Sequence, residues 1–88
     1  MSAKGILLEY AARNNDSNCL TDEQFLGKAI AEGVRICRDG QDIIVRIRRT
    51  GTTIIVAETT QTQTVEAVND KAVVTEHENT VEVLRVDL

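Results

Sequence analysis

The first half of the chain carries apolar residues at helical spacing. Four of them recur at i, i+1, i+4 and i+5, as on one face of a helix: Ile6, Leu7, Tyr10 and Ala11. Residues 14–18 follow with five short polar side chains, which compete for backbone hydrogen bonds and predict a loop. The pattern therefore favours an N-terminal helix. A strand buried on both faces is the alternative for residues 5–11, because Ile6 to Tyr10 also fits that pattern.

A second helix is predicted by a strong start signal at residue 21. Thr21 at the N-cap and Gln24 at the third helical position form a capping box, and Leu20 and Phe25 are spaced for a hydrophobic staple. The apolar positions then continue with a period of about 3.6 residues. They are Phe25, Leu26, Ala29, Ile30, Gly33, Val34 and Cys37.

The end of this second helix has two interpretations. In the first, the helix runs to Arg38 and Gly40 terminates it in the left-handed conformation. In the second, the helix stops at Gly33, and residues 34–37 form a strand that turns at Asp39-Gly40 into residues 43–47. The unbroken helical period favours the longer helix.

From residue 42 onward the chain has the composition of a β-sheet. Apolar and polar residues alternate and β-branched residues dominate. The predicted strands are 43–49 and 52–58 around Thr50-Gly51, then 65–68 and 72–75 around residues 69–71, and finally 81–88 after the polar stretch 76–79. Consecutive strands joined by short loops form an antiparallel meander.

The predicted fold class is α+β, with two N-terminal helices packed on an antiparallel meander sheet of four or five strands. The length of 88 residues fits a single domain over 1–88, with a helical part at about 3–38 and a sheet part at about 42–88. No apolar stretch reaches the roughly 18 residues that a membrane-spanning helix needs.

This sheet has more apolar residues than one covered face can hold. Ile44, Ile54 and Val56 are predicted to face away from the helices, and the last strand has apolar residues on both sides. The sheet must therefore curl, contain a bulge that shifts the register, or be covered by a second chain. The third option predicts a homodimer. The predicted interaction surface consists of Ile44, Arg46, Arg48, Ile54, Val56, Leu84, Val86 and Leu88.

Charge and aromatic content narrow the choice of partner. The net charge of −4 opposes attraction to phosphates or anionic lipid, and two aromatic residues cannot build a platform for stacking bases. Five of the ten basic residues nevertheless fall within fifteen positions: Arg35, Arg38, Arg46, Arg48 and Arg49. A nucleic-acid contact through these arginines is one interpretation, and a solvated face paired with Glu58, Glu66 and Glu82 is the plainer one. Residues 50–88 hold seven acids and two bases, which suggests either a solubilising face or an acidic decoy for a DNA-binding protein.

Residues with catalytic potential form no recognisable pattern. His77 lies between Glu76 and Glu78, but neighbouring strand positions point to opposite faces. Cys37 is expected in the core and Cys19 in a polar loop, both as reduced thiols, and their spacing matches no zinc motif. The row Thr60, Thr62 and Thr64 could meet an ordered surface or an added strand, although an exposed strand of β-favouring residues is the plainer interpretation.

The sequence therefore predicts a small cytoplasmic, non-enzymatic protein–protein interaction module that self-associates as a dimer, of bacterial or phage-like accessory type. No metal, cofactor, membrane or nucleic-acid partner is expected. Nucleic-acid binding through the arginines is the second hypothesis. A small enzyme that uses Cys19 or His77 is the third hypothesis. It ranks last because a domain of this size has little room for a pocket.

Overall fold

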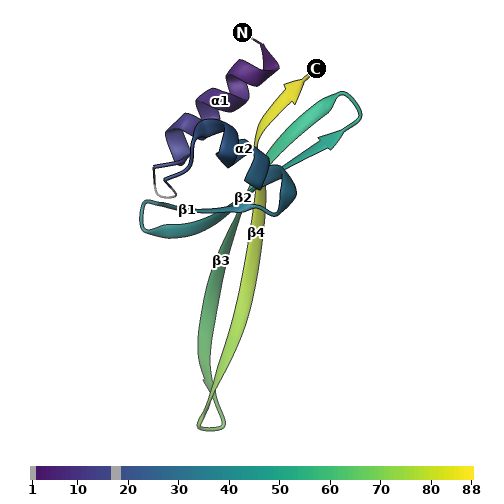
Figure 1. Ribbon diagram of the computed structural model, residues 1–88. Coiled ribbons are helices and arrows are strands. Elements are labelled where there is room, and N and C mark those ends of the chain that lie inside the picture. Colours follow the sequence, from purple (N-terminus) through teal and green to yellow (C-terminus); the bar gives the residue numbers. More distant parts are fainter. Residues whose placement is uncertain (1, 17–18) are drawn as a thin grey trace.

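The computed structural model describes residues 2–16 and 19–88, so residues 17 and 18 of the predicted loop lie outside the described part. Two helices precede four strands, and the helices cover one face of the sheet (Figure 1). The elements are α1 (Ala3–Asn14), α2 (Asp22–Ala31), β1 (Val34–Arg38), β2 (Gln41–Thr50), β3 (Thr53–Val68) and β4 (Lys71–Asp87). The sheet order is β1-β2-β3-β4 with every pair antiparallel, so the predicted α+β meander is confirmed.

Both helices begin at side chains that accept hydrogen bonds from the first turn. The Ser2 hydroxyl accepts from the backbone N–H of Gly5 at 3.1 Å, and α1 is a helix rather than the alternative strand. The predicted capping box of α2 is present, because the Thr21 side chain accepts from the Gln24 N–H and the Gln24 side chain accepts from the Thr21 N–H.

The prediction that the second helix runs to Arg38 is wrong. Helix α2 ends at Ala31, and Gly33 has φ +96°, a value that glycine adopts more readily than other residues. Val34 and Ile36 are buried while Arg35 and Cys37 are exposed, which is the period of a strand. The alternative with a turn at Asp39-Gly40 is therefore the observed one, and Cys37 lies at the surface rather than in the core.

The strands β3 and β4 are much longer than predicted. The segments expected at 65–68 and 72–75 are the far ends of β3 and β4, and the polar residues 59–64 and 76–79 pair with each other inside the same ladder. Val68 pairs with Lys71, so the turn consists of Asn69 and Asp70, which both have positive φ. That conformation matches the twist of a tight two-residue hairpin.

Four residues of the predicted interaction surface lie on the helix-covered face of the sheet. Val56 pairs with Leu84 and Ala57 with Glu82, so Val83 is the extra residue of a bulge. Val56 and Val86 are buried in the core, and Ile54 and Leu84 pack against it. The expectation that Ile54 and Val56 face away from the helices is wrong, because the β2–β3 register places Val56 opposite the core residue Ile47 and Ile54 two residues before it on the same face.

Candidate interaction surface

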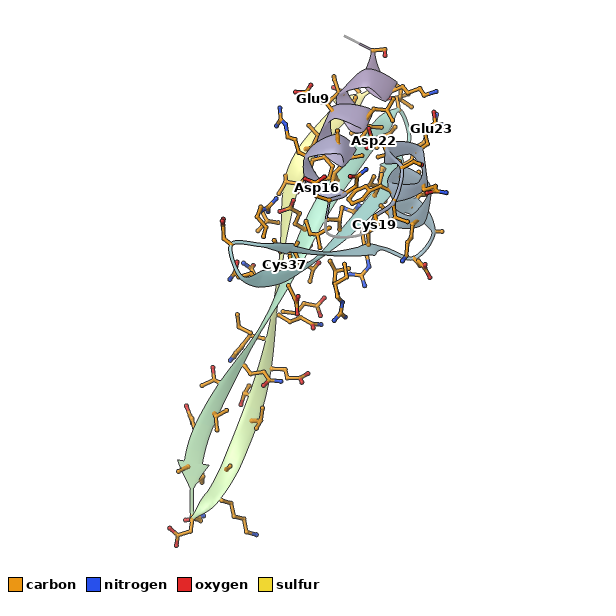
Figure 2. All side chains as sticks on the ribbon, turned by 60° about the vertical axis from the view of Figure 1, so that its left-hand side comes forward. Glu9, Asp16, Cys19, Asp22, Glu23 and Cys37 are labelled. Atoms are coloured by element: carbon orange, nitrogen blue, oxygen red, sulfur yellow. The ribbon has the colours of Figure 1, made fainter. Side chains whose placement is uncertain are left out.

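The outer halves of β3 and β4 form a two-stranded arm that leaves the rest of the molecule (Figure 1). Thr60 is the last β3 residue paired with β2, and eight β3–β4 pairs lie beyond it, from Gln61–Glu78 to Val68–Lys71. At about 3.3 Å per residue the arm projects roughly 26 Å. Every residue from 61 to 83 is exposed, and the side chains along the arm stand apart from the helices (Figure 2). Residues 61–68 and 71–78 are called the arm below.

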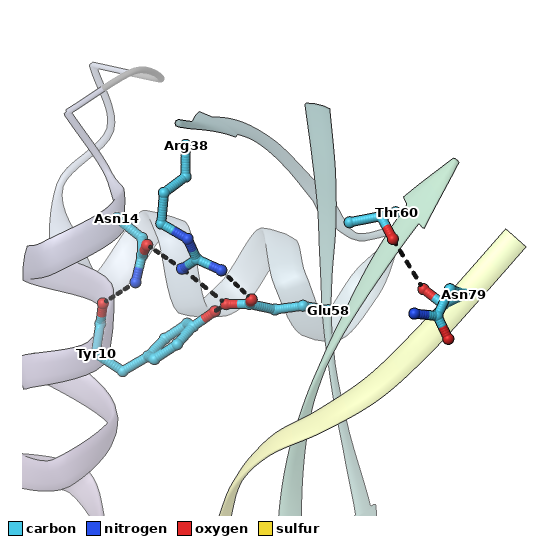
Figure 3. Close-up of polar contacts among 6 residues, drawn as sticks. All are labelled: Tyr10, Asn14, Arg38, Glu58, Thr60 and Asn79. Carbon is cyan, nitrogen blue, oxygen red and sulfur yellow. Dashed lines mark hydrogen bonds and ion pairs between the residues drawn. The ribbon is translucent and has the colours of Figure 1, made fainter. Parts of the chain in front are cut away.

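A polar cluster fixes the base of the arm to the body (Figure 3). Glu58 is the last buried residue of β3 on the helix-covered face, and its carboxylate accepts a 2.6 Å hydrogen bond from the Tyr10 hydroxyl of α1. Arg38 at the end of β1 forms a two-point ion pair with the same carboxylate. Arg38 also donates to Asn14 Oδ1 at 3.3 Å. One carboxylate thus joins α1, β1 and β3 where the arm begins.

The charge states of this cluster follow from its contacts. Burial alone would raise the pKa of Glu58, but the hydrogen bonds from Arg38 and Tyr10 outweigh burial and hold that pKa below its ordinary value. Burial and the hydrogen bond to Glu58 raise the pKa of Tyr10 well above its ordinary value. The hydrogen bond to Glu58 likewise raises the pKa of Arg38. At neutral pH the cluster therefore holds a carboxylate, a guanidinium and a protonated phenol.

The face of the sheet opposite the helices, called the outer face below, has an apolar floor between arginines. Directly opposed residues of antiparallel strands share a face. The cross-strand rows of the body are Arg48–Ile55–Arg85, Arg46–Ala57–Glu82 and Ile44–Thr59–Thr80. Ile55 and Thr59 are buried on this face. A hollow of about 610 Å³ opens here, lined by Ile30, Gly33, Arg46, Arg48, Ile55 and Ala57 among others.

The same alternation continues along the arm. On the outer face it presents the rows Gln61–Glu78, Gln63–Glu76, Val65–Val74 and Ala67–Ala72. Its opposite face carries Thr60, Thr62 and Thr64, with Asn79, His77 and Thr75 across from them. The predicted threonine row therefore exists on a strand, and His77 lies on the face away from Glu76 and Glu78.

The five predicted arginines do not form one patch. Arg38 pairs with Glu58 on the helix-covered side, and Arg49 donates to the Gly51 carbonyl at 3.0 Å. Arg35, Arg46 and Arg48 occupy the outer face, and within the described part of the chain none of these three has a carboxylate at ion-pair distance. Of the carboxylates predicted to pair with these five arginines, Glu58 does so, with Arg38. Glu82 pairs with Arg85, which is not one of the five.

The predicted interaction surface is thus divided between two faces. Arg46 and Arg48 are exposed on the outer face, Ile44 is half-buried there, and Leu88 is exposed at the chain end. Ile54, Val56, Leu84 and Val86 belong to the core side. The sequence reasoning missed the arm. The available signal was the absence of proline and glycine from residues 53–68 and 71–87, on both sides of the Asn69-Asp70 turn.

The thiols and the histidine lie apart from one another. Cys19 and Cys37 are both free and exposed (Figure 2), as predicted for Cys19, and His77 lies on the arm opposite Thr62. Among residues 2–16 and 19–88, no group of three or more histidine, cysteine, aspartate or glutamate side chains is arranged to hold a metal ion.

Comparisons with protein-family models, with curated proteins and with solved structures found no match. In the described part of the chain, neither helix is long and apolar enough to cross a membrane.

Proposed function

We propose that this protein is a small non-enzymatic interaction module that self-associates through its arm. The observation that carries the proposal is the exposure of apolar side chains on a two-stranded ribbon with no covering layer. Val65, Val68, Val73 and Val74 are 64%, 46%, 43% and 54% exposed. An isolated two-stranded hairpin is at best marginally stable in water, so a contact that covers one face of the arm would stabilise it.

The body of the same chain offers a surface of matching character. The outer face has an apolar floor at Ile55 and Ala57, and Ile30 beside it is 65% exposed. A second copy brings one uncovered arm and one uncovered outer face, so a dimer can cover both kinds of surface at once. This supports a dimer as the smallest assembly, with a closed two-fold arrangement as the usual form.

Removal of the arm tests the proposal. In the variant, Asn-Gly replaces residues 62–77, so that the Gln61–Glu78 pair closes a short hairpin and every core residue is kept. We expect a dimer for the full chain and a monomer for the variant in sedimentation velocity at micromolar concentration. Circular dichroism checks that the variant is folded. A full chain that stays monomeric at every concentration, or a folded armless variant that dimerises equally well, would contradict the proposal.

Nucleic-acid binding is the second candidate, and one observation favours it. Arg35, Arg46 and Arg48 lie together on the outer face without ion-pair partners among the described residues. The arm opposes it, because Glu66, Glu76 and Glu78 outnumber Lys71 and would repel a phosphate backbone. Binding of DNA and RNA to the wild type and to Arg46→Glu/Arg48→Glu at low salt tests it. A measurable affinity that this variant loses would favour the second candidate.

The acidic excess of residues 50–88 gives weaker support to a decoy function. Glu66 lies on the helix-side face of the arm, whereas Glu76 and Glu78 lie on the outer face. The acids are thus divided between two faces of a ribbon, and a mimic of a phosphate backbone requires them in a continuous row.

A further inference from the structure

The hollow on the outer face has the smallest side chain of its three cross-strand rows on its floor. That residue is Ala57, which lies between Arg46 on β2 and Glu82 on β4. Its neighbours on the same face of β3 are Ile55 and Thr59, which are both buried. All five residues line the hollow. Larger side chains thus surround one methyl group, and the alanine leaves room for the volume of about 610 Å³.

The unengaged polar groups around Ala57 include several hydrogen-bond donors. Arg46 and Arg48 lie two residues apart on one face of β2, and among the described residues neither has an ion-pair partner. The hydroxyls of Thr59 and Thr80 share a single hydrogen bond of 2.9 Å, in which one of them donates. The proton of the other hydroxyl has no acceptor in the hydrogen bonds of the described chain. Two guanidinium groups and one hydroxyl therefore remain to donate to a ligand.

The two carboxylates at the hollow do not offset these donors. Glu82 accepts two hydrogen bonds from Arg85, at 3.0 and 3.3 Å, so its charge is already paired. Glu32 is exposed at the C-terminal end of α2, where water and salt screen its charge. The unpaired charge on the sheet side of the hollow is that of Arg46 and Arg48, which favours an anionic ligand.

We propose that the hollow binds a small organic acid, in which a carboxylate is joined to an apolar chain. The carboxylate accepts hydrogen bonds from Arg46 and Arg48, and the chain lies on Ile55 and Ala57 beside the exposed side chain of Ile30. The volume is within the usual range for small-molecule sites. One chain supplies every residue of this site, so the inference goes beyond the proposed self-association and does not depend on it.

Both parts of the ligand follow from the lining of the hollow. Inorganic phosphate can pair with Arg46 and Arg48 but leaves the apolar floor in contact with water. An uncharged chain covers Ile55 and Ala57 but leaves the guanidinium groups without an acceptor. A ligand with both parts uses the charge and the apolar surface together, and it gains from each.

Octanoate is a suitable probe, and an NMR titration of the full chain measures its binding. We expect saturable binding, with the largest chemical-shift changes at the amides of Ile55, Ala57 and Thr59. Octanol lacks the charge and acetate lacks the chain, so each should bind at least about tenfold more weakly than octanoate. Inorganic phosphate should bind more weakly than octanoate by a similar factor, because it makes no use of the apolar floor.

A charge-removing variant tests the role of the arginines. Arg46→Gln/Arg48→Gln should weaken octanoate binding at least about tenfold and leave the weak binding of octanol unchanged. Lys4→Gln/Arg13→Gln is the matched control, because it removes the same charge from α1 and should leave octanoate binding unchanged. Both arginines of the first variant are exposed, so it tests the site without a change in the core.

A hollow-filling variant tests the location. Ala57→Leu places a larger apolar side chain on the floor and should abolish octanoate binding. Ala67→Leu makes the same substitution on the outer face of the arm and should leave the affinity unchanged. Circular dichroism of each variant checks that it is folded.

Several results would overturn the inference. Octanoate that does not saturate the wild type at millimolar concentration, or that binds Ala57→Leu equally well, rules out the site. Equal binding of octanol or phosphate rules out the ligand class. An unchanged affinity in Arg46→Gln/Arg48→Gln rules out the role of the arginines. Sedimentation velocity measures the dimer separately, so failure of the titration and failure of the proposed self-association are distinguishable.

Discussion

The Tyr10 hydroxyl and the Glu58 carboxylate are joined by a 2.6 Å hydrogen bond that connects α1 to the base of the arm. Glu58 is 7% exposed, and Arg38 binds the same carboxylate from β1. When a buried carboxylate loses one of its hydrogen-bond donors, the remaining hydrogen bonds no longer offset the full cost of removing it from water. The contacts of α1 and β1 with the base of the arm therefore depend on this cluster.

Removal of the Tyr10 hydroxyl should destabilise the fold. We expect Tyr10→Phe to lower the free energy of unfolding by about 1–3 kcal/mol, the usual value for a hydrogen bond to a charged group. Urea denaturation at fixed protein concentration measures the change. Glu9→Gln breaks only the exposed pair with Arg13 and should cost less than about 0.5 kcal/mol. Equal effects of the two substitutions would show that the cluster contributes no more than a surface ion pair.

Stability should fall in acid because of Glu58. Its pKa in the folded state lies below the ordinary value of 4.5, so the unfolded chain binds the proton more tightly. The stabilisation is therefore complete above about pH 4.5 and is lost as the pH falls through the folded-state pKa. Thermal denaturation between neutral and acid pH measures this loss. Glu58→Gln should flatten the profile in that range, and an unchanged slope would assign the acid sensitivity to other carboxylates.

Gly33 and Gly27 should respond in opposite directions to the same substitution. Gly33 has φ +96°, and a Cβ there would lie 3.3 Å from Arg46 Cγ and from Ile44 Cγ2. Gly33→Ala should therefore destabilise the fold by about 1–2 kcal/mol. Gly27 lies inside α2 with nothing within 4 Å of such a Cβ, so Gly27→Ala should stabilise by about 0.5–1 kcal/mol. Urea denaturation compares the two, and a shared sign would contradict the conformations described for these glycines.

Local signals predicted the start of each element better than its extent. The capping box at Thr21 and the turn within residues 69–71 depend on neighbouring residues. The capping box was found where expected, and the turn lies at Asn69-Asp70 with Lys71 already in β4. The apolar positions from Phe25 to Cys37 follow one helical period, yet the helix ends within them. The alternating residues of β1 happen to continue that period beyond the end of α2. Gly33 separates the helix from the strand with a φ of +96°, which the apolar pattern does not indicate.

The candidate surface was predicted only in part, because its remaining features depend on contacts between segments far apart in the sequence. An excess of apolar strand residues is visible in the sequence, and Arg46 and Arg48 were correctly placed together on one face. Which apolar residues of β4 are exposed depends on the bulge at Val83, which no local pattern signals. The polar composition of residues 59–64 and 76–79 suggested connections, yet those residues pair with one another and build the arm. Pairing between segments so far apart is a tertiary property.

Hydrogen exchange should show whether the arm depends on association for its order. A two-stranded ribbon opens easily, and its backbone hydrogen bonds then exchange with solvent. We expect amides of residues 62–68 to exchange rapidly at concentrations where the chain is monomeric and slowly where it is dimeric. Association stabilises only the conformation that forms the dimer, here the ordered arm, so this protection should rise with protein concentration. Amides of Ile43 and Val45 in the body should stay protected throughout, because both residues are buried and lie on β2 where it is paired on both sides, with β1 and β3. Protection of the arm that is the same at all concentrations would mean that the ribbon is stable by itself.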